Sequence, residues 1–143
     1  MNNLTSIKVL KSANEVFEAF VDPLKIGKFW FSSSSVRWEQ GKIITLRYDE
    51  YNAEADIAIM EIEENRKIVF QWGYNEEGHT VTIMLKALNN TSTIVEVNEE
   101  GFNENEDNLI NNMIDNKEGW VYTLTCLKGY LEYGANLRAS LVK

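Results

Sequence analysis

The sequence predicts an α+β fold in which a curved antiparallel β-sheet wraps around a long C-terminal α-helix, with two short helices after the first strand. Three observations predict it: capped helical segments follow an opening strand, short alternating segments fill residues 35–100, and a helical apolar period runs through the last third. The 143 residues suit one domain, 1–143, which is large enough to bury a full core.

The opening segment predicts one strand and two helix starts. "LTSIKVL" at 4–10 alternates apolar and polar residues, as a half-buried strand does. Ser12 and Glu15 match a capping box, so a helix is expected to begin after Ser12. Asp22 can cap a second short helix, and Pro23 suits its first position.

The middle of the chain predicts an antiparallel meander. Short apolar segments alternate with turns at "NRK", "NEEG" and "NNTS", which favours strands joined by tight connections and one polar face. The segment "ADIAIMEIEE" is apolar on both faces, so its register stays ambiguous. The predicted strands are 36–38, 43–48, 55–64, 68–72, 79–88 and 93–100.

The last third predicts one helix of about 30 residues, roughly 45 Å long, which must lie across the sheet. Asn103 and Glu106 match a second capping box, and the apolar stripe stays in phase across Gly119. Gly119 itself points away from the stripe, which suggests a bend or a docking point. The stripe comprises Leu109, Ile110, Met113, Ile114, Trp120, Val121, Leu124, Leu127 and Leu131.

Four motifs occur in an order that resembles a known superfamily. They are "VFEAFVDPLKIGKFWF" at 16–31, "IVFQW" at 68–72, "STIVEVNEEGF" at 92–102 and "GWVYTLTCLKGYLEYG" at 119–134. Their order resembles the START-like (birch-pollen-allergen-like, SRPBCC) helix-grip superfamily, and more closely its bacterial heat-shock-protein-90 ATPase activator-like, polyketide-cyclase-like proteins. The resemblance covers nearly the whole chain. It implies a helix-grip fold with a ligand cavity between the sheet and the long helix.

The residues expected to line that cavity are mostly aromatic. Apolar walls with few polar groups suit a flat hydrophobic ligand, although large apolar side chains at such spacings are more often core. Lys117, inside the apolar stripe, could hold a ligand anion at the cavity mouth, or its stem could simply cover apolar surface. The candidate ligand-binding residues are Phe20, Phe29, Trp30, Trp38, Tyr48, Phe70, Trp72, Ile83, Lys117, Trp120 and Leu124.

Other polar residues give little indication of catalysis. The lone histidine, His79, follows a predicted turn and has no recognisable partner, so a surface position is expected. The acidic pairs at 63–64, 76–77 and 99–100 lie at or beside predicted turns and are expected to be solvated. No catalytic residues are predicted.

The opposite face of the long helix has almost no charge and is expected to be covered. The cover would be the tail "ANLRASLVK" at 135–143 or a second copy of the chain, because tyrosine is enriched at interfaces. Because tyrosine also tolerates water, a plain exposed face is the third alternative. A homodimer would use Tyr122, Cys126, Tyr130 and Tyr133.

Composition excludes several classes of function. A net charge of −8 disfavours a nucleic-acid surface, and one cysteine cannot form an internal disulfide or a thiolate metal site. No signal peptide, membrane span, metal-ligand spacing or cofactor motif is found, so we expect a cytoplasmic protein without a cofactor or metal.

Three functions remain open. The first is non-enzymatic binding of a small hydrophobic molecule, such as a lipid, polyketide or flavonoid-like compound, in the predicted cavity. The second, implied by the resemblance, is a chaperone-cofactor role toward a heat-shock-protein-90-type ATPase. The third is a cyclase- or hydrolase-like enzyme that uses the same cavity.

Overall fold

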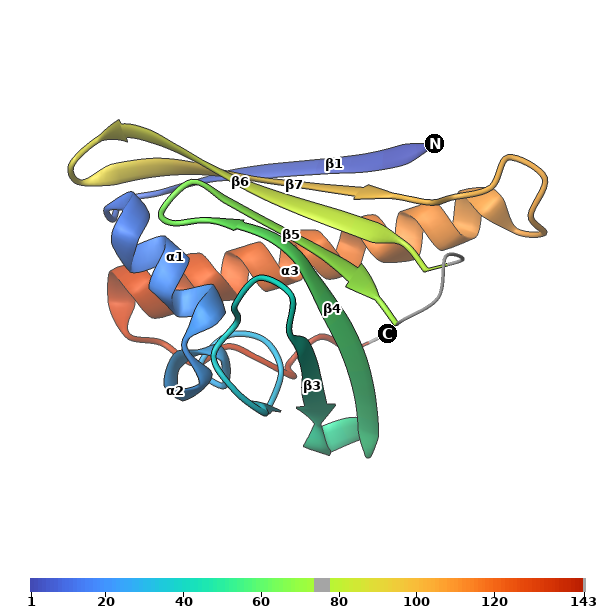
Figure 1. The fold of residues 1–143 in the computed structure, drawn as a ribbon, viewed down its shortest axis with the longest axis horizontal. Helices are drawn as coiled ribbons and strands as arrows, with labels where there is room; N and C mark the ends of the chain where they lie inside the picture. The colour runs from blue at the N-terminus through green and yellow to red at the C-terminus, as the bar shows by residue number, and fades with distance from the viewer. Residues whose placement is uncertain (74–77, 143) are drawn as a thin grey trace.

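The computed structural model describes residues 1–73 and 78–142, and it shows a curved sheet with a long helix across its concave side (Figure 1). The elements in chain order are β1 (Asn2–Val9), α1 (Ala13–Val21), α2 (Pro23–Ile26), β2 (Ser33–Ser34), β3 (Ile43–Tyr48), the 3₁₀ turn η1 (Asp49–Tyr51), β4 (Ala53–Glu63), β5 (Lys67–Trp72), β6 (Thr80–Asn89), β7 (Ser92–Glu100) and α3 (Leu109–Tyr133). The predicted α+β helix-grip class is therefore confirmed.

The described strands form one antiparallel sheet in the order β1-β7-β6-β5-β4-β3-β2. The predicted strand at 36–38 is wrong, because this segment is a loop that packs on the end of α1. There the backbone N–H of Trp38 donates to the carbonyl of Val21 at 3.1 Å. The predicted turn "NEEG" includes residues 75–77, which lie outside the described residues.

A β-bulge resolves the ambiguous register of β4. Its pairing with β5 shifts between Ile59 and Glu61, which leaves Met60 exposed on the outer surface. Ile57 and Ile59 remain buried on the concave face. Bulges bend the strand that carries them, so this one also contributes to the curvature of the sheet.

The two short helices begin where the sequence predicts. The Ser12 hydroxyl accepts from the backbone N–H of Glu15 at 3.2 Å, and the Asp22 carboxylate accepts from that of Leu24 at 2.9 Å. Pro23 occupies the first turn of α2. These caps fix both helices against one end of the sheet (Figure 1).

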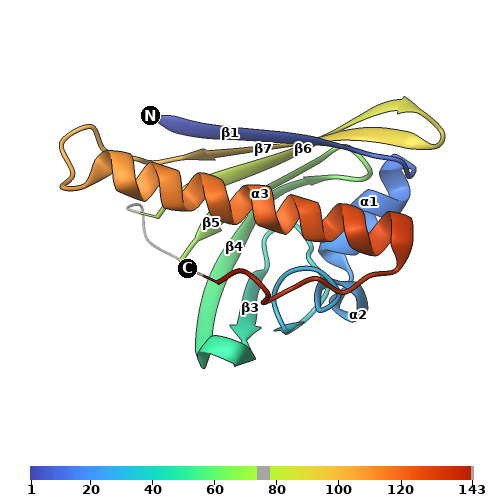
Figure 2. The same ribbon diagram turned by 180° about the vertical axis from the view of Figure 1, so that it is seen from behind.

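The long helix α3 runs beside β1 and spans 25 residues, so it is shorter than expected (Figure 2). The Asn103–Glu106 box forms a turn before the helix instead of its start: the Glu106 carboxylate accepts from the Asn103 N–H at 3.4 Å. Asn108, with a left-handed φ of 60°, then redirects the chain. Among the described residues, no helix is long and apolar enough to cross a membrane.

The core fills the space between the sheet, α1, α2 and the C-terminal half of α3. Its largest buried side chains include Trp38, Phe20, Phe29 and Phe70. Each such side chain contributes roughly 1.5–3 kcal/mol through the apolar surface removed from water. The candidate site lies beside this packed core.

Candidate functional site

A cavity of about 340 Å³ lies between the sheet, the middle of α3 and the chain that follows α3. Aromatic side chains dominate its wall, with a few polar groups among them. The lining residues are Phe29, Trp30, Tyr48, Tyr51, Trp72, Glu99, Asn116, Gly119, Trp120, Tyr122, Thr123, Arg138, Ala139 and Leu141. The cavity predicted between sheet and helix is therefore present.

Trp30 is the centre of the aromatic wall. Its ring centroid lies 5.2 Å from that of Trp120 and 6.5 Å from that of Trp72. The indole rings of Trp30 and Trp72 are nearly perpendicular, with an interplanar angle of 87°. Because Trp30 follows α2 while Trp72 lies on β5 and Trp120 on α3, the wall depends on the whole fold.

A buried carboxylate, Glu99, forms the polar part of the wall and is only 3% exposed. Its Oε1 accepts from Trp120 Nε1 at 3.0 Å and from Trp72 Nε1 at 3.4 Å. Its Oε2 lies 2.7 Å from Nδ1 of His79. The expectations that the 99–100 pair is solvated and that His79 lacks a partner are therefore wrong for Glu99 and His79.

The alternation of β7 places Glu99 inside. Thr93, Val95 and Val97 point into the core, and Glu99 continues this inward series, whereas Glu100 is exposed. This period of two is the signal that could have identified Glu99 from the sequence. Proximity to a predicted turn concealed it.

Gly101 allows His79 to approach Glu99. Gly101 has a φ of +119°, and a Cβ atom on it would lie 2.8 Å from His79 Cδ2. On its other side the His79 ring packs on Phe102, with centroids 4.4 Å apart. The imidazole is thus held between the backbone of Gly101 and an aromatic ring.

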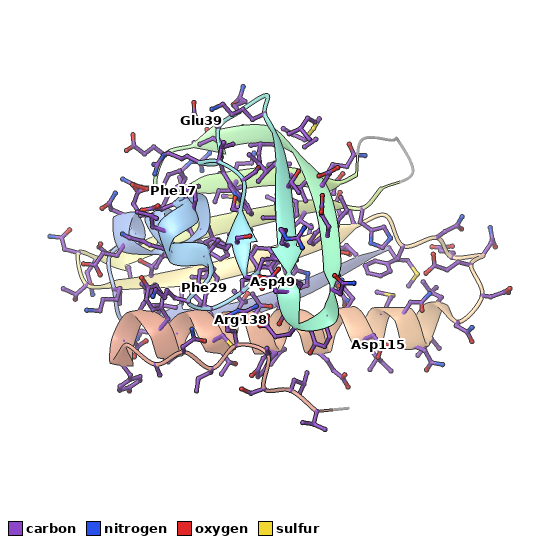
Figure 3. The ribbon with its side chains drawn as sticks, turned by 90° about the horizontal axis from the view of Figure 1, so that it is seen from below. Phe17, Phe29, Glu39, Asp49, Asp115 and Arg138 are labelled. Carbon is purple, nitrogen blue, oxygen red and sulfur yellow. The ribbon has the colours of Figure 1, made fainter. Side chains whose placement is uncertain are left out.

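The tail after α3 closes another side of the cavity, and Arg138 anchors it. Gly134, with a φ of +66°, ends α3, and the chain then runs back along the helix (Figure 2). Arg138 Nε donates to the Trp30 carbonyl at 2.9 Å, and the guanidinium forms an ion pair with Glu50. Figure 3 shows Arg138 near Phe29, beside the long helix.

The Arg138 cluster changes the acidity of two groups at the cavity. Hydrogen bonding from Arg138 lowers the pKa of Glu50 from its ordinary 4.5 to about 2. The guanidinium also stands 5.0 Å from the centre of the Tyr48 ring. Burial raises the pKa of Tyr48 despite this neighbouring cation. Arg138 therefore keeps Glu50 ionised near neutral pH, whereas burial keeps Tyr48 protonated.

The structure brings only some of the predicted site residues to the cavity. Its wall contains Phe29, Trp30, Tyr48, Trp72 and Trp120. The remaining apolar candidates belong to the packed core and do not line the cavity: Phe20, Trp38, Phe70, Ile83 and Leu124.

Lys117 does not lie at the mouth of this cavity. Its ammonium donates to the carbonyl of Leu4 on β1, and its side chain lies on the surface. Other lining residues, from β7, η1, α3 and the tail, were not predicted. Those residues are Tyr51, Glu99, Asn116, Gly119, Tyr122, Thr123, Arg138, Ala139 and Leu141.

The tail also covers much of the uncharged face of α3. The Tyr122 hydroxyl donates to the Leu137 carbonyl and accepts from the backbone N–H of Ser140 at 3.2 Å. Cys126 is buried, and burial raises the pKa of its thiol. Of the four predicted interface residues, Tyr133 remains widely exposed. Dimerisation through this face stays a prediction.

Glu99 and His79 form a carboxylate–imidazole pair at the polar part of the wall. Among residues 1–73 and 78–142, no cluster of three or more histidine, cysteine or acidic side chains could hold a metal ion. A ligand would meet aromatic rings, the Glu99 carboxylate and the polar side chains of Asn116, Thr123 and Arg138.

Solved structures share this fold. The chain is similar to protein SSP2350 from Staphylococcus saprophyticus, with 47% identity, 96% of each chain covered and a TM-score of 0.85. It is also similar to the Aha1 dimer from Colwellia psychrerythraea, at 21% identity, with 94% of this chain and 98% of that chain covered and a TM-score of 0.80. DynU16, from the dynemicin biosynthetic locus, has 19% identity and a TM-score of 0.81; the match covers 94% of this chain and 48% of that one.

The family follows from the sequence itself. A comparison with curated proteins found no match. The family model described as "Activator of Hsp90 ATPase homolog 1-like protein" matches residues 11–132, which include every described element from α1 to most of α3. The chain therefore belongs to the Activator of Hsp90 ATPase homolog 1-like family.

Proposed function

We propose that this protein binds a small, largely apolar molecule in the cavity between the sheet and α3. The observation that carries the proposal is a cavity of about 340 Å³ whose wall is mainly aromatic and contains one buried carboxylate. Ligand sites are typically concave and apolar, with a few placed polar groups.

The four tryptophans allow a direct test. Trp30, Trp72 and Trp120 line the cavity, whereas the Trp38 indole is buried in the core and donates to Ser34 Oγ at 3.2 Å. Titration with a panel of flat aromatic compounds should shift the indole N–H resonances of the first three saturably. The Trp38 resonance should stay in place as an internal control.

A blocking variant tests whether the cavity is the site. A Cβ atom on Gly119 would meet nothing within 4 Å, so Gly119→Leu should place its side chain in the cavity and abolish the shifts. Asn111→Leu adds the same side chain to an exposed position on α3 and should bind like the wild type. Equal binding by both variants, or no saturable shift with any compound, would overturn the proposal.

Family membership favours a second candidate, interaction with a heat-shock-protein-90-type ATPase. The matched family is described by that activity, and this chain shares its fold over residues 11–132. The ATPase rate of the host chaperone, measured with increasing amounts of this protein, would distinguish the two roles. An unchanged rate at saturating protein would exclude the second candidate and leave the first.

A further inference from the structure

The carboxylate of Glu99 has an unusual set of partners for a buried charge. Two of its three partners are indole N–H groups, which can only donate, so Oε1 acts as an acceptor. An ionised carboxylate has about four acceptor sites, and three are used by the contacts to Trp72, Trp120 and His79. Among the described residues, the fourth acceptor site of Glu99 has no partner, and Glu99 lines the cavity.

No lysine or arginine among the described residues forms an ion pair with Glu99. Its one titratable partner among the described residues is His79, through Oε2. The other charged group in the wall, Arg138, is paired with Glu50 and so contributes little net charge. Buried charges are normally compensated by an opposite charge, so this part of the wall is suited to receive a cation.

The aromatic rings around Glu99 favour the same kind of group. Trp72 and Trp120 both donate to it, and Trp30 lies within 6.5 Å of each of these rings. Tryptophan faces attract cations more strongly than those of the other aromatic side chains. Trp30, Trp72 and Trp120 line the same cavity as Glu99, so the body of a ligand whose ammonium group pairs with this carboxylate would meet their rings.

We propose that the cavity selects an organic cation, an ammonium group on an apolar body, with its nitrogen at Glu99 among Trp30, Trp72 and Trp120. This proposal rests on the proposed function and narrows it to one class of ligand. The net charge of −8 favours the approach of such ligands over anionic ones.

Three probes of the same shape test the charge preference. They are 2-naphthylmethylamine, which is a cation at pH 7, the neutral 2-naphthylmethanol, and the anion 2-naphthoate, each titrated by calorimetry into the wild-type protein. The amine should bind at least about tenfold more tightly than the alcohol, and naphthoate should bind most weakly. Equal or tighter binding of the alcohol or naphthoate would overturn the cation proposal and leave small-molecule binding intact. Absence of binding by all three would count against both proposals.

Variants of two adjacent residues test whether Glu99 causes the preference for the amine. Glu99→Gln removes the buried charge with little change in size, and the preference for the amine over the alcohol should fall to within about threefold. Glu100→Gln removes the same charge from the exposed face of β7 and should retain the full preference. An undiminished preference in Glu99→Gln would overturn the proposal. If Glu99→Gln does not fold, the order of the affinities of the three probes for the wild-type protein still tests the cation proposal.

Discussion

The two halves of α3 follow the same apolar period, but only the C-terminal half is packed against the core. All five buried residues of the helix lie between Trp120 and Gly129, whereas none lies between Leu109 and Gly119. Leu127 is fully buried, but Ile110 and Ile114 of the same predicted stripe are 73% and 51% exposed. Hydrophobic periodicity therefore indicates which residues share a face, but it does not indicate whether anything packs beneath that face.

Polar contacts hold the N-terminal half instead. Asn3 Nδ2 donates to the Met113 carbonyl at 2.7 Å and to Asn116 Oδ1 at 3.2 Å, and Lys117 donates to Leu4. These bonds attach the half-helix to the edge strand β1 without filling the space beside it. The cavity lies at the junction between this N-terminal half of α3 and the packed C-terminal half, next to Gly119 and Trp120.

The largest predicted effect is a difference in stability loss between substitutions in the two halves of α3. Leu127→Ala should lower the free energy of unfolding by about 2–5 kcal/mol, because it leaves a void in the core. Ile114→Ala, in the same stripe, should change it by no more than about 0.5 kcal/mol. Urea unfolding of both variants measures the difference. Similar losses would mean that the N-terminal half is also packed, and the comparison would fail.

The next effect concerns the polar end of the cavity. Gly101→Ala should destabilise by about 2–4 kcal/mol, because backbone strain adds to a collision with His79. Gly41 also has a positive φ, of +87°, but an added Cβ would meet nothing within 4 Å. Gly41→Ala should therefore cost only about 1–2 kcal/mol. Thermal unfolding that ranks Gly41→Ala as the more damaging would refute the close packing at His79.

A smaller effect tests the helix at its junction. Gly119→Ala should stabilise the protein by up to about 1 kcal/mol, since alanine favours a helix and meets no neighbour. Gly129→Ala should gain less, because its Cβ would lie 2.8 Å from Leu137 Cδ1 in the tail. Denaturation midpoints of the two variants give the comparison. A greater gain at Gly129 would show that the tail does not press on the helix there.

The smallest effect is acid-dependent and concerns the tail. The Glu50 pKa is about 2 in the folded protein and 4.5 ordinarily, so its pair with Arg138 contributes stability above about pH 4.5. That contribution is lost as the pH falls from about 4.5 to about 2. Glu50→Gln should therefore show a weaker loss of stability over this interval than the wild type. Superimposable pH profiles would contradict the ion pair.

The sequence predicted the fold well because local signals determine much of it. Ser12 and Asp22 cap their helices as expected, and alternation identified β3, β5, β6 and β7. The segment 36–38 was mistaken for a strand because its packing depends on α1, which is distant in sequence. The start of α3 was misplaced because Asn108 takes a left-handed conformation that no local pattern marked.

The site was harder to predict than the fold. Aromatic lining such as Trp72 and Trp120 was found, but core and cavity residues have the same composition, so Phe70 and Leu124 were included as well. Glu99 was recoverable from the alternation of β7. Arg138 was not, because its partner Glu50 is 88 residues away and the tail has no periodic signal.

Because the tail folds back along α3, Cys126 can report when this wall of the cavity opens. Cys126, the one cysteine of the sequence, is about 1% exposed on the helix face that the tail covers. A thiol reagent can reach it only when residues 135–142 detach or the helix opens. The labelling rate of Cys126 therefore measures how often this wall of the cavity opens, and a ligand that holds Arg138 and Tyr122 in place should slow the reaction.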